Sequence, residues 1–161
     1  MLLIADQISK LSFSGLMQVY AESNALNAGE QECSLLDIEQ GFYDYLRSSF
    51  FAQENSFYAV WLEAGEYVSA LRMEPFKDGF LLCTLETAPQ HRRKGYAEKL
   101  IKAVLALEKL AGKTVYSHIH KKNRASQAVH AACGFVKIMD RALYLDGSAN
   151  SYCDTWKLER E

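Results

Sequence analysis

The chain of 161 residues has the size of one domain, and with 49% hydrophobic residues it can bury a core. A net charge of −2 argues against general nucleic-acid binding, which needs a basic face. The four cysteines lie far apart and form no C-x-x-C pair, so neither a zinc site nor a disulfide framework is expected.

Targeting signals are not evident either. Met1–Ala5 is too short for a signal peptide and lacks a basic start, and no apolar run approaches membrane length. We therefore expect a cytoplasmic protein with neither a membrane nor a nucleic-acid partner.

The N-terminal part is expected to hold one strand and two helices. Leu2–Ile4 reads as a short strand, and the apolar spacing in Phe13–Ser23 and in Leu35–Phe51 predicts a helix in each. The intervening stretch Asn24–Glu32, with its Asn and Gly residues, is expected to be a loop. Acidic residues on the second helix predict a solvated face or, alternatively, a surface that attracts a cationic amine.

The middle of the chain predicts an antiparallel meander. Phe57–Leu62, Tyr67–Met73 and Leu81–Thr87 read as successive strands. The turns between them are expected at Glu63–Glu66 and Lys77–Gly79.

The next stretch joins a strand to a helix through a basic turn. Pro89 ends the last strand of the meander, and a helical apolar stripe runs from Ala97 to near Gly112. The turn carries Arg92, Arg93 and Lys94 followed by a glycine. A turn into a helix N-terminus presents unpaired N–H groups and a positive dipole end, which predicts a pyrophosphate site. A solvated basic turn is the alternative.

The C-terminal part completes the sheet. Thr114–His120 reads as a strand that the preceding helix makes parallel to the meander's last strand. Asn123 caps a short helix that ends at Gly134. Val136–Leu145 and Tyr152–Leu158 are expected to form a hairpin around Asp146-Gly147, giving a mixed α/β sheet.

The short helix is predicted to have two faces. One is an apolar stripe that should enter the core, made of Ala125, Ala128, Val129 and Ala132. The other should look along a cleft and carries Asn123, Ser126 and His130. The alternative roles are an N-cap for the first, a small surface residue for the second and a solvated or core-edge histidine for the third.

Two motifs resemble the GNAT superfamily of N-acetyltransferases. The first, over Pro89–Ala97, reads P-x-x-R-x-x-G-Y-A, and the second, over Asn123–Phe135, reads N-x-x-S-x-x-x-H-x-x-x-G-F. The resemblance implies an α/β (α+β) fold with a mixed, mostly antiparallel central sheet flanked by helices, forming a single N-acetyltransferase domain over residues 1–161. It also implies direct transfer of an acetyl group from acetyl-CoA to a primary amine.

The resemblance also implies a cofactor site without a metal. Backbone groups near the end of the third meander strand would hold the pantetheine and polarise the thioester carbonyl, and the amides of the basic turn would bind the pyrophosphate. The expected cofactor-binding residues are Leu85, Glu86, Thr87, Arg92, Arg93, Lys94, Gly95, Tyr96, Ala97, Glu98, Asn123 and Ser126.

His130 stands where the family commonly has a tyrosine that protonates the departing coenzyme A thiolate. A thiol has a pKa of roughly 8.5, so its thiolate is a tolerable leaving group even without an acid. His130 is predicted to be the general acid, with a merely polar pocket residue as the alternative. Tyr144 and Tyr152 are alternative donors.

The general base is not assigned. Strand alternation puts Leu81, Cys83, Leu85 and Thr87 on one side, and if that side faces the cleft Glu86 points away from it. Glu86 would then be a structural carboxylate that pairs with a nearby Arg or Lys. His118 and His120 share a strand face and are either a proton relay through water or half-exposed strand residues.

A second function class is a non-catalytic acyl-CoA-binding or partner-binding module. It would keep the cleft and lack turnover, and release of thiol with any amine separates the two. The acceptor is left open between a small amine, an amino acid, a peptide N-terminus and an aminoglycoside, and the oligomeric state between monomer and homodimer.

Overall fold

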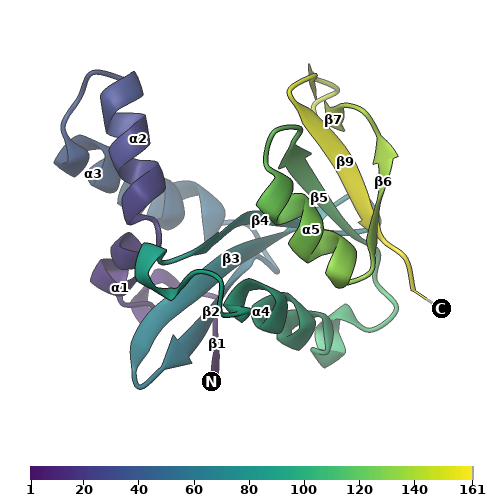
Figure 1. The fold of residues 1–161 in the computed structure, drawn as a ribbon, viewed down its shortest axis with the longest axis horizontal. Helices are drawn as coiled ribbons and strands as arrows, with labels where there is room; N and C mark the ends of the chain where they lie inside the picture. Colours follow the sequence, from purple (N-terminus) through teal and green to yellow (C-terminus); the bar gives the residue numbers. More distant parts are fainter. Residues whose placement is uncertain (161) are drawn as a thin grey trace.

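A single sheet runs through the middle of the molecule, and helices cover both of its faces (Figure 1). The computed structural model describes residues 1–160. The strands are β1 (Leu2–Ala5), β2 (Phe57–Glu63), β3 (Glu66–Phe76), β4 (Gly79–Thr87), β5 (Val115–His120), β6 (Phe135–Met139), β7 (Ala142–Leu143), β8 (Ala149–Asn150) and β9 (Cys153–Leu158). The helices are α1 (Phe13–Val19), α2 (Ala21–Glu30), α3 (Leu35–Tyr45), α4 (Tyr96–Leu105) and α5 (Arg124–Ala132).

The strand order confirms the predicted fold class. Seven strands lie in the order β1-β2-β3-β4-β5-β9-β6, and β7 and β8 form a separate ribbon. Strands β1 to β4 are antiparallel neighbours, and β4 and β5 are parallel, joined by α4 as a crossover. The sheet is therefore mixed and mostly antiparallel.

Side-chain alternation along β2 explains why both faces of the sheet are buried. Phe57 and Ala59 belong to the core beneath α4, whereas Tyr58 and Val60 belong to the core beneath α1 and α3. None of the helices within residues 1–160 combines the length and the apolar character needed to cross a membrane.

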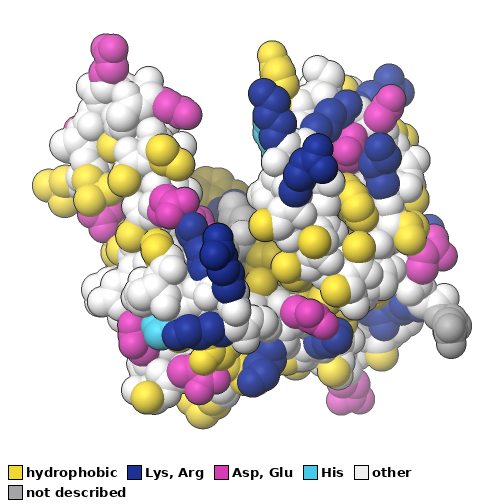
Figure 2. Space-filling model, viewed as in Figure 1, with side chains coloured by type: hydrophobic (Ala, Val, Ile, Leu, Met, Phe, Trp, Pro, Cys, Tyr) yellow, Lys and Arg dark blue, Asp and Glu magenta, His cyan; other side chains and the backbone are white. Residues whose placement is uncertain are grey.

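Strands β4 and β5 pair over a short length only. Their register runs from Phe80 opposite Val115 to Leu82 opposite Ser117. Beyond these pairs β4 continues to Thr87 without a partner on β5, and the two strands diverge (Figure 1). We call the opening between their diverging ends the gap. Figure 2 shows the hollow that results, with α2 and α3 on one side and α5 on the other.

The N-terminal helices differ from the prediction. The helix expected over Phe13–Ser23 is divided at Tyr20 into α1 and α2, and the loop expected over Asn24–Glu32 is mostly α2. Most of α2 is exposed and only Asn24 is buried, at 5% exposure, but the helix packs against α3, and this tertiary contact overrides the low helix propensity of Asn and Gly. The helix over Leu35–Phe51 is confirmed as α3 and a π-helical turn.

The C-terminal half of the chain also differs from the prediction in the bounds of its elements. The apolar stripe to Gly112 is α4 followed by a 3-10 turn at Glu108–Leu110, not one continuous helix. The strand expected over Val136–Leu145 is broken between β6 and β7, where Thr155 donates a 2.7 Å hydrogen bond to the carbonyl of Arg141. A turn at Asp146-Gly147 does join β7 to β8, while the long pairing is between β6 and β9.

Candidate active site

The loop between β4 and α4 has the backbone of an anion-binding turn. Arg93 and Gly95 adopt left-handed conformations, with φ of +62° and +80°, and such residues turn successive N–H groups toward one point. Helix α4 begins at Tyr96, and no side chain caps it. A Cβ added to Gly95 would meet no atom within 4 Å, so open space lies over the backbone. The first N–H groups of α4 are therefore available to an anion.

The side chain of Arg92 is engaged in holding the loop in place. Its Nη1 lies 2.9 Å from Glu22 Oε2, its Nη2 lies 3.6 Å from Glu86 Oε1, and its Nε donates to the carbonyl of Thr87 at 3.2 Å. These contacts connect α2 and the end of β4 to the loop. Arg92 can thus serve an anion site through its backbone while its side chain sets the position of the loop.

A pocket of about 670 Å³ opens beside this loop, and basic side chains lie on both sides of the hollow (Figure 2). Most residues predicted to bind the cofactor line this pocket: Leu85, Glu86, Thr87, Arg92, Arg93, Gly95, Tyr96, Ala97, Glu98, Asn123 and Ser126. Lys94 and His130 are not among the lining residues. The structure thus brings the two motifs together around one cavity.

A bulge shapes the part of β4 that borders the gap. Thr84 has a φ of +51°, which is rare for a β-branched residue, and the register with β3 shifts beside it. Tyr20 donates a 2.8 Å hydrogen bond to the carbonyl of Thr84, and Tyr58 donates one of 2.8 Å to the Tyr20 hydroxyl. The strained backbone is therefore held from the α1 side of the sheet.

The bulge overturns the predicted alternation along β4. Leu81 and Cys83 lie on the face away from α4, but Leu85 packs into the α4 core with Leu82. An extra residue at the bulge moves every later side chain to the opposite face. Glu86 lines the pocket instead of pointing away from it, and it does pair with Arg92 as expected for a structural carboxylate.

The environment of Glu86 favours its neutral form more than water would. Burial raises the pKa of this carboxyl, while a 2.7 Å hydrogen bond from Ser23 and the charge of Arg92 act in the opposite direction. Glu86 thereby connects α2 to the pocket wall.

The prediction for the two faces of α5 is only partly right, since Asn123 and Ser126 line the pocket as expected while His130 and the alanines do not lie as predicted. Ala125, Ala128 and Ala132 are exposed, whereas His130 is 1% exposed and Ser126 is half-buried. Helix α5 packs on α4 and β6 through the longer side chains, because alanine methyl groups bury little surface and set no preference. Of the predicted apolar stripe only Val129 is half-buried, where it packs against the α4 core.

Asn123 has both of the roles that the sequence left open. Its Oδ1 accepts a 3.0 Å hydrogen bond from the Ser126 N–H, which caps α5, and the residue also lines the pocket. His130 lies one turn beyond Ser126 along the helix and packs edge-on against Phe135, at 5.1 Å between ring centres.

The hydrogen bonding of His130 fixes its neutral tautomer. Nδ1 lies 2.7 Å from the Ser126 carbonyl, which only accepts, so Nδ1 carries the proton and Nε2 a lone pair. Nε2 is buried and has no partner among residues 1–160. Burial lowers the pKa of His130, against the opposing effect of the Ser126 carbonyl. Its role as a proton donor stays a prediction.

His118 lies on β5 just beyond the last residue that pairs with β4. Its ring packs edge-on against Phe76 and Tyr144, and its Nε2 is buried without a partner among residues 1–160. Burial, and then the charge of Lys77, lowers the pKa of His118. A neutral imidazole at this position can accept a proton.

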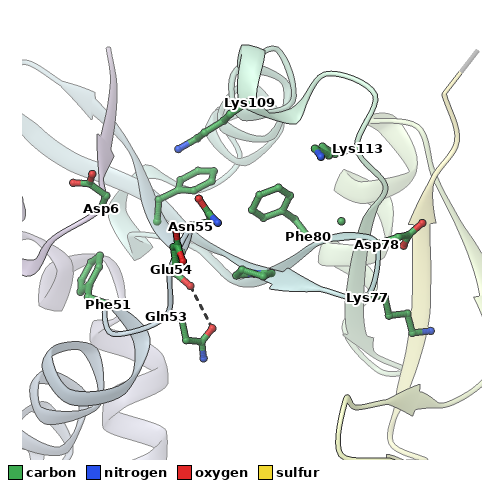
Figure 3. Close-up of a pocket in the computed structure, with 14 residues that line it drawn as sticks. Asp6, Phe51, Gln53, Glu54, Asn55, Lys77, Asp78, Phe80, Lys109 and Lys113 are labelled. Carbon is green, nitrogen blue, oxygen red and sulfur yellow. Dashed lines mark hydrogen bonds between the residues drawn. The ribbon is translucent and has the colours of Figure 1, made fainter.

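A second pocket of about 650 Å³ lies at the opposite end of the sheet. Its walls come from the loop before β2, the β3–β4 turn and the segment after α4 (Figure 3). Lys109 lies over the ring of Phe57 at 3.3 Å from its centre, and Lys77 and Asp78 line the turn. No residue of either motif lines this pocket, so the cavity beside α4 is the candidate active site.

Comparison with known families agrees with this geometry. A family model described as the acetyltransferase (GNAT) family matches residues 21–135. The chain belongs to the GNAT acetyltransferase family. It is therefore an acyltransferase, and the resemblance read from the two motifs is confirmed. No curated protein sequence matches the chain.

Solved structures share the GNAT fold at low sequence identity. The protein PH1933 from Pyrococcus horikoshii OT3 has a TM-score of 0.68 and 13% identity, over 100% of this chain and 99% of that one. The PaiA N-acetyltransferase from Thermoplasma acidophilum, in complex with coenzyme A, has a TM-score of 0.64 and 11% identity, over 99% of both chains. The ribosomal-protein-S18-alanine N-acetyltransferase from Escherichia coli has a TM-score of 0.62 and 16% identity, over 98% and 93%.

Three residues near the gap of this GNAT protein were missed by the sequence analysis: Tyr20, Tyr58 and Arg72. Tyrosines on a helix and a strand that read as core give no signal of a shared hydrogen bond. Arg72 could have been found from the sequence, because it is the single charged residue inside the predicted strand Tyr67–Met73, and a charge within a buried strand is unusual.

Proposed function

We propose that this chain transfers an acetyl group from acetyl-CoA to a primary amine by direct transfer, and that residues 1–161 form one N-acetyltransferase domain. The observation that carries the proposal is the uncapped N-terminus of α4, with its open space over Gly95, at the mouth of a pocket lined by both motifs. The bound coenzyme A in a structural neighbour supports the same donor class.

The residues of this chain fit such a donor in two places. Backbone N–H groups over Arg92–Glu98 would bind the pyrophosphate, with the helix dipole adding to their attraction. The unpaired edge of β4 over Leu85–Thr87 would hold the pantetheine as an added strand would be held. When bound, acetyl-CoA supplies the acetyl group as an activated thioester.

His118 is the residue that we propose as general base. It stands at the opening of the gap, and its depressed pKa leaves a lone pair at neutral pH. The attacking amine must lose a proton, and His118 would accept it directly or through one water. His130 is kept as the proposed proton donor to the leaving thiolate, with Tyr144 and Tyr152 as alternatives.

Two measurements test the proposal. Saturating acetyl-CoA or free coenzyme A should stabilise the protein by about 2.7 kcal/mol at 100 times its Kd, whereas NAD and ATP should have little effect. Acetyl-CoA-dependent thiol release should then appear with at least one member of an amine panel. Binding without turnover by any amine would favour the non-catalytic module, and no binding would refute the donor assignment.

A further inference from the structure

Arg72 of β3 is a cation that has no ion-pair partner in the described part of the chain, residues 1–160. Its guanidinium carbon lies 5.0 Å from the centre of the Tyr45 ring and 5.3 Å from that of Phe50. Its Nε is buried and has no hydrogen-bond partner, and the guanidinium forms no ion pair within residues 1–160. A partly buried cation that lacks a partner is costly, so its persistence points to a group that is absent from the protein itself.

The nearest candidate within the fold does not fill this role. Glu74 lies two residues further along β3, on the same face as Arg72. Its Oε1 accepts a hydrogen bond from the Cys83 thiol, with 3.6 Å between oxygen and sulfur, and it forms no ion pair with Arg72. Burial and the charge of Glu74 raise the pKa of Cys83, so the thiol stays protonated and offers Arg72 no negative charge.

The position of Arg72 relates it to the gap between β4 and β5. Arg72 is directly opposite Cys83 in the register of β3 and β4, and Cys83 is the first β4 residue beyond the pairing with β5. The next residue is Thr84, the bulge held by the Tyr20 hydroxyl. The unpaired guanidinium therefore stands one residue from the backbone that borders the gap.

Arg72 lies on the face of the sheet opposite to α4. Arg72 packs with Tyr45 and Phe50, which belong to the α3 side, whereas the loop and pocket of the proposed donor lie at the N-terminus of α4. If the donor fills the α4 side of the gap, the acceptor must approach from the α3 side, where Arg72 lies.

We propose that Arg72 binds a carboxylate of the acceptor, which makes the acceptor an amino acid or a closely similar compound with an amine and a carboxylate. This inference rests on the proposed acetyl transfer. The planar guanidinium offers forked donors that match the two oxygens of a carboxylate, and the rings of Tyr45 and Phe50 hold it flat. One guanidinium balances one negative charge, which suits a carboxylate better than a phosphate dianion.

The test compares acceptors that differ only in this charge. Each proteinogenic amino acid is assayed beside its carboxamide for acetyl-CoA-dependent thiol release, with wild type, Arg72→Gln, Arg72→Lys and Arg47→Gln. Arg47 is an exposed arginine on the π-helical turn beside Phe50, so its variant makes the same change in net charge without touching Arg72's contacts. Binding of acetyl-CoA to each variant is measured separately by thermal shift.

We expect wild type and Arg47→Gln to prefer the amino acid over its amide. Arg72→Gln should lower kcat/KM for the amino acid by about 10- to 100-fold, the range of a lost charged hydrogen bond, and change the amide by less than about threefold. Arg72→Lys should fall between the two, because it keeps the charge and loses the fork. It also covers the case in which the glutamine variant does not fold.

Other outcomes would overturn the assignment. These are equal turnover of acids and amides by wild type, equal losses for both in Arg72→Gln, or no turnover of any amino acid by a protein that binds acetyl-CoA. A protein that binds no acetyl-CoA would instead refute the proposed function, so the two failures are distinguishable.

Discussion

The hydroxyl of Tyr20 donates a 2.8 Å hydrogen bond to the backbone carbonyl of Thr84, the bulge residue of β4. Tyr58 donates to Tyr20 in turn, so a chain of two phenols links β2 to the strained backbone beside the gap. Burial raises the pKa of Tyr20 well above its usual value and that of Tyr58 to about 12, so both hydroxyls keep their protons. The chain acts as a support that fixes where the β4 edge faces the gap.

Removing the Tyr20 hydroxyl should affect activity more than stability. Tyr20→Phe should cost about 1–2 kcal/mol of unfolding free energy and lower kcat/KM by about 10-fold or more, because the bulge would shift against the substrates. Tyr116→Phe is the matched control, since its hydroxyl donates to Asp78 at the paired end of β4 and β5. Equal kinetic losses in both variants would contradict a special role for the Tyr20–Thr84 bond.

Gly95 should matter through the anion site. Gly95→Glu should weaken coenzyme A binding by about tenfold or more, equivalent to at least about 1.4 kcal/mol, because it places a carboxylate over the helix N-terminus. Gly112→Glu is the control, because Gly112 also has a positive φ and open space around its Cβ position. Both variants should lose about 1–2 kcal/mol of stability to backbone strain. Unchanged affinity in a folded Gly95→Glu protein would move the anion site elsewhere.

The pH dependence of kcat tests His130. As a proton donor the ring must be protonated, and burial lowers its pKa, so the rate should fall as the pH rises through a value below about 6.5. His130→Ala should lower kcat with little change in KM for acetyl-CoA, and His130→Tyr should restore much of it and move the alkaline limb upward. If the pH profiles of kcat for wild type and both variants have the same shape, His130 is not the proton donor and its role is to pack against Phe135.

The same burial makes stability sensitive to acid. His118 and His130 have lowered pKa values in the folded protein, so below about pH 6.5 the unfolded chain binds protons that the folded chain does not. The free energy of unfolding is therefore complete above that pH and falls as the pH decreases through this window. A His118→Gln, His130→Gln double variant should show a shallower fall in urea titrations at pH 7 and pH 5.

Exposed His120, at the end of β5, provides the control for that experiment. A His120→Gln protein should keep the steeper acid dependence of wild type. If the double variant instead loses stability as steeply as wild type, carboxylates and not the two buried histidines determine the acid limb.

The motifs predicted the loop, the pocket and most of its lining because they act over short distances. The β4–α4 turn depends on Gly95 and its neighbours, and the α5 cap on Asn123 alone, so local sequence was sufficient. The meander was predictable for the same reason, since its strands are joined by short turns at Gly65 and Asp78.

Features set by distant contacts were not predictable. The Thr84 bulge depends on a hydroxyl 64 residues away, and it reverses the side of Leu85 and Glu86. Which side of α5 is buried depends on the side chains that fit against Phe135. The spacing of the alanines therefore predicted the wrong buried side. Helix α2 forms where Asn and Gly favour a loop, because it packs against α3 and buries Asn24.

The short pairing of β4 with β5 divides the sheet into two halves, β1–β4 and β5-β9-β6. Only three residue pairs join them, and we call this line of pairs the seam. A donor molecule bound along the unpaired part of β4 would supply hydrogen bonds between the diverging strands and connect the two halves of the sheet. Amide hydrogen exchange should then slow on both sides of the seam when coenzyme A binds, including at residues that never touch it. The ligand would thereby determine how stiffly the two halves move together.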